Sequence, residues 1–211
     1  MRPSIKSLAI GAAIVALALF WFAGGERAQP QLEPLAADAR ILAFGNSLTH
    51  GTGASPEESY PAVLAELVGR DVVRSGVPGE ETAAGRERLP GVLGDVEPDL
   101  LILMHGGNDI LRDRAAGDIE ANLAAMVEMA HARGVRVVLV GIPERSLFSS
   151  VAGFYEDVAA AHDVPLETGI IRTILRDDGL TSDPIHPNAA GYRRLAEAVR
   201  NLLAESGAIR E

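Results

Sequence analysis

The sequence predicts an α/β fold in which helices cover both faces of a parallel β-sheet. From residue 38 onward, apolar runs that suit buried strands alternate with stretches of helical periodicity. Two of the runs, LLILM at residues 100–104 and VRVVLV at residues 135–140, are almost continuously apolar, as expected of strands buried on both faces. Polar segments that contain glycine, asparagine or proline follow the strands, where sheets of this kind bind ligands.

The individual elements follow from this alternation in chain order. The strands are expected at residues 41–44, 72–73, 100–104, 135–140 and 164–167, the last with a weak apolar signal. The helices are expected at residues 60–68, 82–93, 119–133, 151–162 and 189–206. The third of these helices has the clearest periodicity and stops before Gly134, a residue type that is common just past a helix C-terminus.

The N-terminal residues 1–25 have the layout of a secretory signal peptide or an N-terminal membrane anchor. Basic residues precede an uncharged apolar run over residues 8–23. As a helix this run spans about 24 Å, less than the roughly 30 Å hydrocarbon core of a bilayer, which favours a signal peptide. A tether to the inner membrane through residues 8–23 is the alternative, because the cleavage site is poor. Both interpretations export a linker at 26–37 and one domain at 38–211 to the periplasm or the cell exterior.

The composition excludes several classes of function. The formal net charge is −10 and no basic stripe compensates for it, so nucleic acid is not expected as a partner. The chain has no cysteine, which excludes disulfides, a cysteine nucleophile and zinc–thiolate sites. With 211 residues, the chain is long enough to bury a full core without such supports.

The segment GNSLTHG at residues 45–51 places a serine at the end of the first strand. A serine hydroxyl becomes a useful nucleophile when a base accepts its proton and donors stabilise the oxyanion that develops. Ser47 lies where the strand gives way to a helix N-terminus, so its backbone N–H can point into a site. Gly45 permits the tight turn. The alternative is that Ser47 only caps the helix, a common role of serine.

The segment SDPIHPN near the C-terminus supplies a candidate base and its orienting acid. Asp183 and His186 are three residues apart, so the carboxylate can hold the proton on the δ nitrogen of the ring. The ε nitrogen is then free to accept the proton of Ser47. Asn188 can cap the following helix. The alternative is an ordinary turn before proline in which His186 is incidental.

Two further segments offer hydrogen-bond donors for an oxyanion. Asn108, in GGND after the third strand, has a side-chain amide that can donate to a developing negative charge. Gly79, in GVPGEET after the second strand, can supply a backbone N–H at close approach. Taken singly, each residue fits an ordinary turn equally well.

Together, the four segments resemble the SGNH (GDSL-type) hydrolase superfamily. They are most similar to its small bacterial esterases, arylesterases, thioesterases and lysophospholipases, in the same order and with similar spacing over residues 40–205. The resemblance implies a flavodoxin-like, three-layer α/β/α sandwich with a five-stranded parallel sheet. It also implies hydrolysis of esters without a metal or another cofactor.

The resemblance assigns a role to each candidate residue. Ser47 matches the nucleophile, and Asp183 and His186 match the acid and the base. Gly79 and Asn108 match the oxyanion-hole residues, with the backbone N–H of Ser47 as the third donor.

One position departs from the family pattern. The usual G-D-S reads Gly45-Asn46-Ser47, so Asn46 keeps the size and hydrogen-bonding capacity of aspartate without its charge. We interpret both Gly45 and Asn46 as supporting residues. His50 and His105 are expected to line the same crevice, with packing and hydrogen-bonding roles.

The sequence therefore predicts an exported serine esterase that acts on small-molecule or lipid esters through an acyl-enzyme. Short-chain and aryl esters and lysophospholipids are the expected substrates. The alternatives are a carbohydrate O-acetylesterase and a non-catalytic binding domain on the same fold. A metal-dependent phosphoesterase is disfavoured, because no D-x-H pair follows the first strand. Residues 56–60, 110–118 and 143–154 are expected to shape the substrate pocket.

Overall fold

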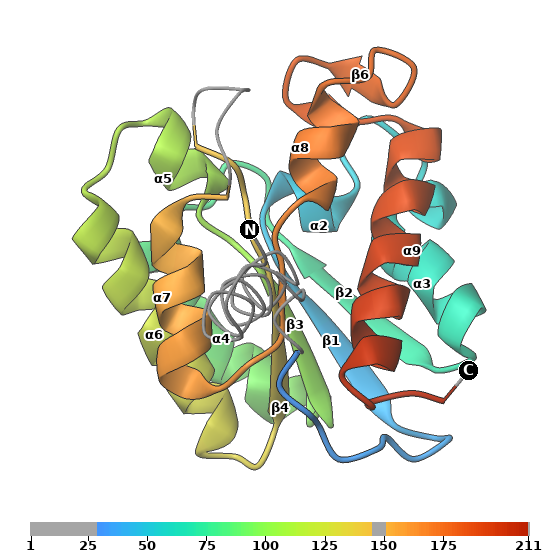
Figure 1. Cartoon of the computed structure of the whole chain (residues 1–211), viewed down its shortest axis with the longest axis vertical. Helices are drawn as coiled ribbons and strands as arrows, with labels where there is room; N and C mark the ends of the chain where they lie inside the picture. Colours follow the sequence, from blue (N-terminus) through green and yellow to red (C-terminus); the bar gives the residue numbers. More distant parts are fainter. Residues whose placement is uncertain (1–28, 145–150, 211) are drawn as a thin grey trace, which may run out of the picture.

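The computed structural model describes residues 29–144 and 151–210, and it has the three layers that the alternation predicts (Figure 1). The central sheet is parallel, with the strand order β2-β1-β3-β4-β5. This is the order of flavodoxin-like α/β folds. The strands are β1 (Arg40–Gly45), β2 (Asp71–Gly76), β3 (Leu100–Met104), β4 (Arg136–Val140) and β5 (Leu166–Glu167).

Helices cover both faces of this sheet (Figure 1). One face carries α4 (Thr82–Val96), α6 (Ala116–His131) and α7 (Gly153–His162), which pack against one another. The other carries α3 (Tyr60–Val68), α8 (Ile170–Leu175) and α9 (Ala189–Glu205). Shorter elements lie in the loops: α2 (Ser47–His50), η1 (Pro56–Glu58), α5 (Gly107–Leu111) and an antiparallel hairpin of β6 (Thr181–Asp183) and β7 (His186–Pro187).

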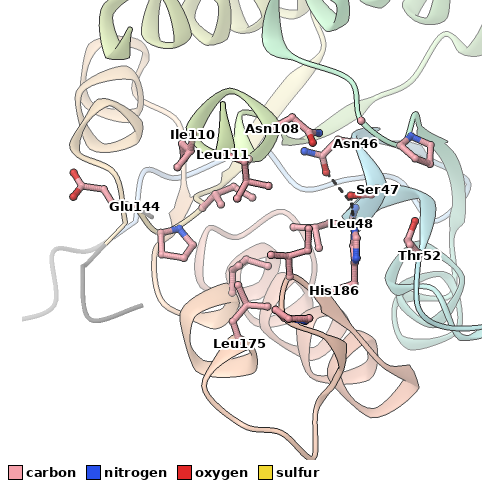
Figure 2. A pocket seen from close by; sticks show the side chains of 18 residues that line it. Asn46, Ser47, Leu48, Thr52, Asn108, Ile110, Leu111, Glu144, Leu175 and His186 are labelled. Carbon is pink, nitrogen blue, oxygen red and sulfur yellow. Dashed lines mark hydrogen bonds between the residues drawn. The ribbon is translucent and has the colours of Figure 1, made fainter. Parts of the chain in front are cut away.

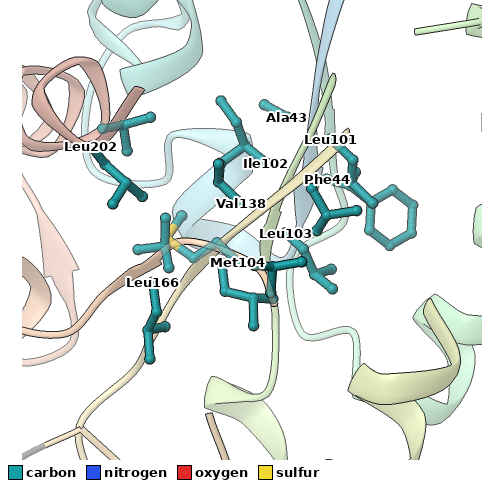
Figure 3. Packing of buried hydrophobic residues seen from close by; sticks show 14 of the residues in the cluster. Ala43, Phe44, Leu101, Ile102, Leu103, Met104, Val138, Leu166 and Leu202 are labelled. Carbon is teal, nitrogen blue, oxygen red and sulfur yellow. The ribbon is translucent and has the colours of Figure 1, made fainter. Parts of the chain in front are cut away.

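The core lies on both sides of the central strands (Figure 3). All five residues of β3 are fully buried, and so are the last five residues of β1. Successive side chains of a strand point to opposite faces, so Ile102 and Leu103 contact different helix layers. A continuous apolar run is therefore what a strand in this position requires.

The five predicted strands and five predicted helices are confirmed, with differences at their ends. The second strand extends beyond residues 72–73, because it pairs with β1 from Asp71 to Gly76 although its side chains are only partly buried. The third helix starts three residues earlier than expected and ends at His131, so Gly134 lies in the turn that follows.

Residues 29–37, expected to be a linker, pack against the domain. Leu35 is part of the hydrophobic core, and its backbone N–H donates to the carbonyl of Ala208 at 2.8 Å. The backbone N–H of Leu32 donates likewise to Ser206. The predicted export segment, residues 1–25, lies outside the described residues. Across the ranges that the structure describes, no helix has the length and apolar character needed to span a bilayer.

Candidate active site

The turn that carries Ser47 is held by its neighbours on both sides. Asn46, not Ser47, is the N-cap of α2, and its side chain accepts a hydrogen bond from the backbone N–H of Leu48 at 3.2 Å. The interpretation of Ser47 as the cap is therefore wrong. A Cβ at Gly45 would collide with the backbone oxygen of Met104, so only glycine fits where β1 passes β3 into the turn.

Ser47, His186 and Asp183 form a continuous chain of hydrogen-bonding atoms (Figure 2 shows the Ser47–His186 pair). Ser47 Oγ lies 3.0 Å from His186 Nε2, and His186 Nδ1 lies 2.8 Å from Asp183 Oδ2. An ionised carboxylate only accepts, so Nδ1 carries the ring proton and Nε2 is left to accept from the serine. The structure thus brings together the three residues that the sequence singled out.

Asp183 is held in the ionised form by donors of its own hairpin. The backbone N–H groups of Ile185 and His186 both donate to Asp183 Oδ1 at 2.9 Å. Burial on its own raises the pKa of Asp183, but these bonds and the hydrogen bond and charge of the His186 ring outweigh it and lower the pKa below its usual value. The carboxylate is therefore available to orient the ring at neutral pH.

The hairpin is fastened to the helix behind it and to the nucleophile turn. Asn188 is the N-cap of α9, as predicted, and its side-chain oxygen accepts from Gly191 N–H at 3.1 Å. The hydroxyl of Tyr192 in α9 donates to the carbonyl of Thr52 at 2.7 Å. This bond ties the helix that follows His186 to the loop that follows Ser47.

Gly79 sits in a tight turn that exposes its backbone N–H. Glu80 N–H donates to the carbonyl of Val77 at 3.2 Å, with Pro78 and Gly79 between them and φ of +78° at Gly79. Proline followed by a positive-φ glycine is typical of a type II turn, in which the central N–H bonds to neither end. The Gly79 N–H makes no hydrogen bond with any residue in the described ranges.

Asn108 lies in the first turn of α5, the short helix that follows β3. Its side-chain Nδ2 donates to the carbonyl of Glu80 at 2.9 Å, which leaves its second N–H free. Asn108 and Gly79 line the same cavity as Ser47 and His186. The predicted oxyanion donors are therefore gathered beside the nucleophile.

The cavity beside Ser47 has a volume of about 330 Å³ and a mostly apolar wall (Figure 2). Of the predicted pocket segments, residues 110–118 contribute Ile110 and Leu111, and residues 143–154 contribute Pro143 and Glu144. Residues 56–60 contribute nothing, and residues 145–150 lie outside the described chain.

Sequence reasoning missed other parts of the wall. Ile171 and Leu175 come from α8, a six-residue helix that is too short to show periodicity. Ile185 lies in the hairpin between the acid and the base. The only available signal for Ile185 was an apolar residue inside the otherwise polar segment SDPIHPN.

The two histidines expected in the crevice do not line it. His50 is exposed at the end of α2, and its carbonyl accepts from Arg74 at 3.1 Å. His105 is fully buried beneath the site, with its Nε2 3.0 Å from a carboxylate oxygen of Glu80. In the described part of the chain, no three His, Asp or Glu side chains are grouped as metal ligands would be.

The chain is similar to known ester hydrolases. The family model described as "GDSL-like Lipase/Acylhydrolase family" matches residues 43–194. Esterase TesA of Pseudomonas aeruginosa is 30% identical over 175 residues, which cover 78% of this chain and 87% of that protein. The arylesterase of Vibrio mimicus is 26% identical over 180 residues, which cover 80% of this chain and 90% of that protein.

Solved structures show the same similarity. The crystal structure of TesA superposes with a TM-score of 0.71 at 28% identity, covering 78% of this chain and 97% of that one. The crystal structure of AlinE4, an SGNH-hydrolase family esterase, superposes with a TM-score of 0.64 at 30% identity, covering 82% of this chain and 98% of that one.

Proposed function

The chain belongs to the GDSL-like lipase/acylhydrolase family of ester hydrolases, and on this premise we propose that it cleaves carboxylic esters through an acyl-enzyme on Ser47. The observation that carries the proposal is the unbroken chain from Asp183 through His186 to Ser47, with contacts of 2.8 Å and 3.0 Å. A serine next to an oriented imidazole is the arrangement that nucleophilic acyl transfer requires.

Acylation begins when Ser47 Oγ attacks the ester carbonyl and its proton passes to His186 Nε2. Asp183 stabilises the imidazolium that forms. The negative charge on the carbonyl oxygen is met by the N–H groups of Ser47 and Gly79 and by the side-chain amide of Asn108. The intermediate collapses, the C–O bond to the alcohol breaks, and His186 returns the proton to the leaving alcohol.

Deacylation repeats these steps with water as the nucleophile. His186 accepts a proton from the water as the water attacks the acyl carbonyl, and the same donors hold the oxyanion. His186 then protonates Ser47 Oγ as the acid product leaves. One water is consumed, and one alcohol and one carboxylic acid are released.

The cavity wall supports an apolar acyl or aryl group as the part of the substrate that is bound. Ile142, Ile171 and Leu175 line the inside, and Leu111 and Ile185 are large apolar side chains, each 42% exposed, on its border. Burial of apolar substrate surface here stabilises the complex by roughly 25 cal/mol per Å². This wall favours simple, aryl or lipid-derived esters over acetylated carbohydrate, which presents hydroxyl groups that need polar partners.

An exported location is part of the proposal. It is supported by the charged and then apolar layout of residues 1–25, which lie outside the described ranges. Cleavage of this segment releases the domain, and retention of it tethers the domain to the membrane.

The test is hydrolysis of p-nitrophenyl esters from acetate to palmitate by the full chain, with EDTA present throughout. Wild type is expected to turn over the esters, and Ser47→Ala is expected to lose at least about 10³-fold in kcat. Ser55→Ala is the matched control, because Ser55 is an exposed cap of η1 outside the cavity. Full activity of Ser47→Ala would overturn the assigned nucleophile.

A further inference from the structure

We propose that Glu80 is a positioning residue that sets the oxyanion hole, and that Arg88 and His105 clamp its carboxylate for that purpose. The inference rests on the proposed function, since it concerns the donors Gly79 and Asn108. Glu80 follows Gly79 in the chain and accepts a hydrogen bond from Asn108, so one residue touches both donors.

The carboxylate of Glu80 is gripped from two sides. Arg88 donates from Nε to Oε1 at 2.8 Å and from Nη2 to Oε2 at 2.7 Å, a bidentate pair. His105 Nε2 lies 3.0 Å from Oε2. The Glu80 side chain is only 7% exposed and His105 is fully buried. Such a geometry leaves the carboxylate a single orientation.

The histidine is fixed as a donor by the backbone next to it. Gly106 N–H donates to His105 Nδ1 at 3.1 Å, so Nδ1 accepts and the ring proton sits on Nε2, facing Glu80. A Cβ at Gly85 would lie 2.5 Å from His105 Nε2, so α4 passes directly against the ring. The ring therefore cannot turn away without moving that helix.

The arginine is fixed in the same way. Arg88 Nη1 donates to Ser75 Oγ at 2.7 Å, and the guanidinium carbon lies 4.0 Å from the centre of the Phe44 ring. The Phe44 ring contact and the Ser75 bond anchor the cation to β1 and β2, the strands that lead into Ser47 and Gly79. The Arg88 side of the clamp is therefore anchored to β1, the strand that also places the nucleophile, and to β2.

The clamp acts on the donors through the main chain of Glu80. The backbone of α5 is already fixed, because Asp109 accepts from Thr82 Oγ1 at 2.6 Å and from Thr82 N–H at 2.9 Å. What remains free is the rotation of the Asn108 amide. The carbonyl of Glu80 accepts from Nδ2 at 2.9 Å, which fixes the nitrogen rather than the oxygen on the Glu80 side and leaves the second N–H of the amide for an oxyanion.

The other donor depends on the same residue. Glu80 N–H closes the turn to Val77 at 3.2 Å, and this turn fixes the backbone of Gly79, which lines the cavity. A shift of Glu80 therefore moves both donors. Misplacement by about 1 Å can cost on the order of 10²-fold in rate.

The chemistry of the clamp argues for positioning rather than for stability alone. A buried ion pair gains little net stability over apolar residues of similar size, because both charges lose their water. The adjacent Glu81 shows the ordinary alternative: it pairs with Arg114 at 2.8 Å and with Arg112 at 3.3 Å on the exposed surface. Glu81 thus serves as the matched control.

The test compares Glu80→Gln, Arg88→Lys and the control Glu81→Gln in the full chain, with kcat and KM for a p-nitrophenyl ester. Glu80→Gln is expected to lower kcat about 10-fold with KM within about twofold, because only the transition state has the oxyanion. Arg88→Lys keeps the positive charge but cannot form the bidentate pair with Glu80, and it is expected to lower kcat several-fold. Glu81→Gln is expected to match wild type. The midpoint of urea unfolding checks that each variant is folded. If Glu80→Gln fails to fold, Arg88→Lys provides the test.

A double-mutant cycle with Asn108→Ala separates this inference from the proposed function. Asn108→Ala alone is expected to lower kcat on the order of 10²-fold, and Glu80→Gln is expected to add at most about threefold on that background. If Asn108→Ala is as active as wild type, the proposed oxyanion hole fails. If Asn108→Ala is impaired while folded Glu80→Gln and Arg88→Lys keep the wild-type kcat, the positioning role alone is overturned. Equal losses from Glu80→Gln in both backgrounds also overturn it.

Discussion

His186 Nε2 lies 3.0 Å from Ser47 Oγ, although the two residues are 139 positions apart and belong to different elements. Ser47 is fixed to the sheet through β1, whereas His186 is carried by a two-stranded hairpin outside it. The distance between them therefore depends on contacts that fasten the hairpin and α9 to the nucleophile turn.

Tyr192→Phe is expected to weaken this connection. The change removes the 2.7 Å bond to the carbonyl of Thr52 and should lower the free energy of unfolding by about 1–2 kcal/mol, with a several-fold loss of kcat. Tyr60→Phe is the control, because the Tyr60 hydroxyl is buried and has no hydrogen-bond partner in the described chain. It should leave stability unchanged or raise it. Urea unfolding of both variants is the measurement, and equal destabilisation would contradict the assignment.

Asp183→Asn is expected to lower kcat on the order of 10³-fold while the protein stays folded. Asparagine can donate to His186 Nδ1, which favours the tautomer whose Nε2 carries a proton and cannot accept from Ser47. Steady-state kinetics with a p-nitrophenyl ester measure the loss. Asp177→Asn is the control, since Asp177 caps a surface turn through Gly179 N–H. A change in KM alone would argue against an orienting role for Asp183.

Asn46→Asp is expected to retain activity within about threefold of wild type. Aspartate keeps the acceptor for Leu48 N–H, so the N-cap of α2 survives the change. Asn46→Ala removes that acceptor and should cost about 1 kcal/mol of stability and lower kcat as the turn loosens. Parallel kinetics and thermal melts distinguish the two. Inactivity of Asn46→Asp would show that the site requires a neutral side chain here.

The clamp on Glu80 predicts a specific dependence of stability on pH. Burial on its own raises the pKa of Glu80, but hydrogen bonds from Arg88 and His105 and the charge of Arg88 lower it to about 2. A depressed pKa contributes stability above the ordinary value near 4.5, and this contribution is lost as the pH falls through about 2. The difference in unfolding free energy between wild type and Glu80→Gln should therefore shrink between pH 4.5 and 2. Urea titrations across this range test it, and parallel pH profiles would contradict it.

Leu175→Trp is expected to change substrate preference more than catalysis. Leu175 lies on α8 in the cavity wall, so a larger ring fills space that the substrate chain would occupy (Figure 2). Hydrolysis of octanoate esters should fall at least about 10-fold relative to acetate esters. The acetate rate of the same variant is the internal control. An unchanged chain-length profile would place the acyl group elsewhere.

The candidate catalytic residues, which the structure brings together, could be singled out from the sequence because their signals are local. A buried strand followed by GNSLTHG, and an acid three residues before a histidine, are each visible within a few positions. The buried strands were equally clear, since β3 is apolar at every position. The edge strand β2 was under-predicted because its pairing with β1, not its own side chains, sets its length.

The supporting structure could not be predicted because it depends on contacts between distant segments. Neither α8 nor the hairpin is long enough to show hydrophobic periodicity in the sequence, although residues of both line the cavity. The link between His105 and Glu80 crosses 25 positions and two elements. The sequence around His105 does not distinguish a buried side chain that binds Glu80 from a side chain that lines the crevice.

The segment that leads into β1 and the segment that follows α9 lie at the end of β1 opposite to α2 (Figure 1), and the backbone N–H of Leu35 donates there to the carbonyl of Ala208. An affinity tag or a bead attached beyond Arg210 therefore sits on the far side from the cavity mouth. Such a handle leaves the approach of an ester to Ser47 open. The domain is thus suited to immobilisation on a solid support in one orientation, with the face that carries Ser47 turned to the solution.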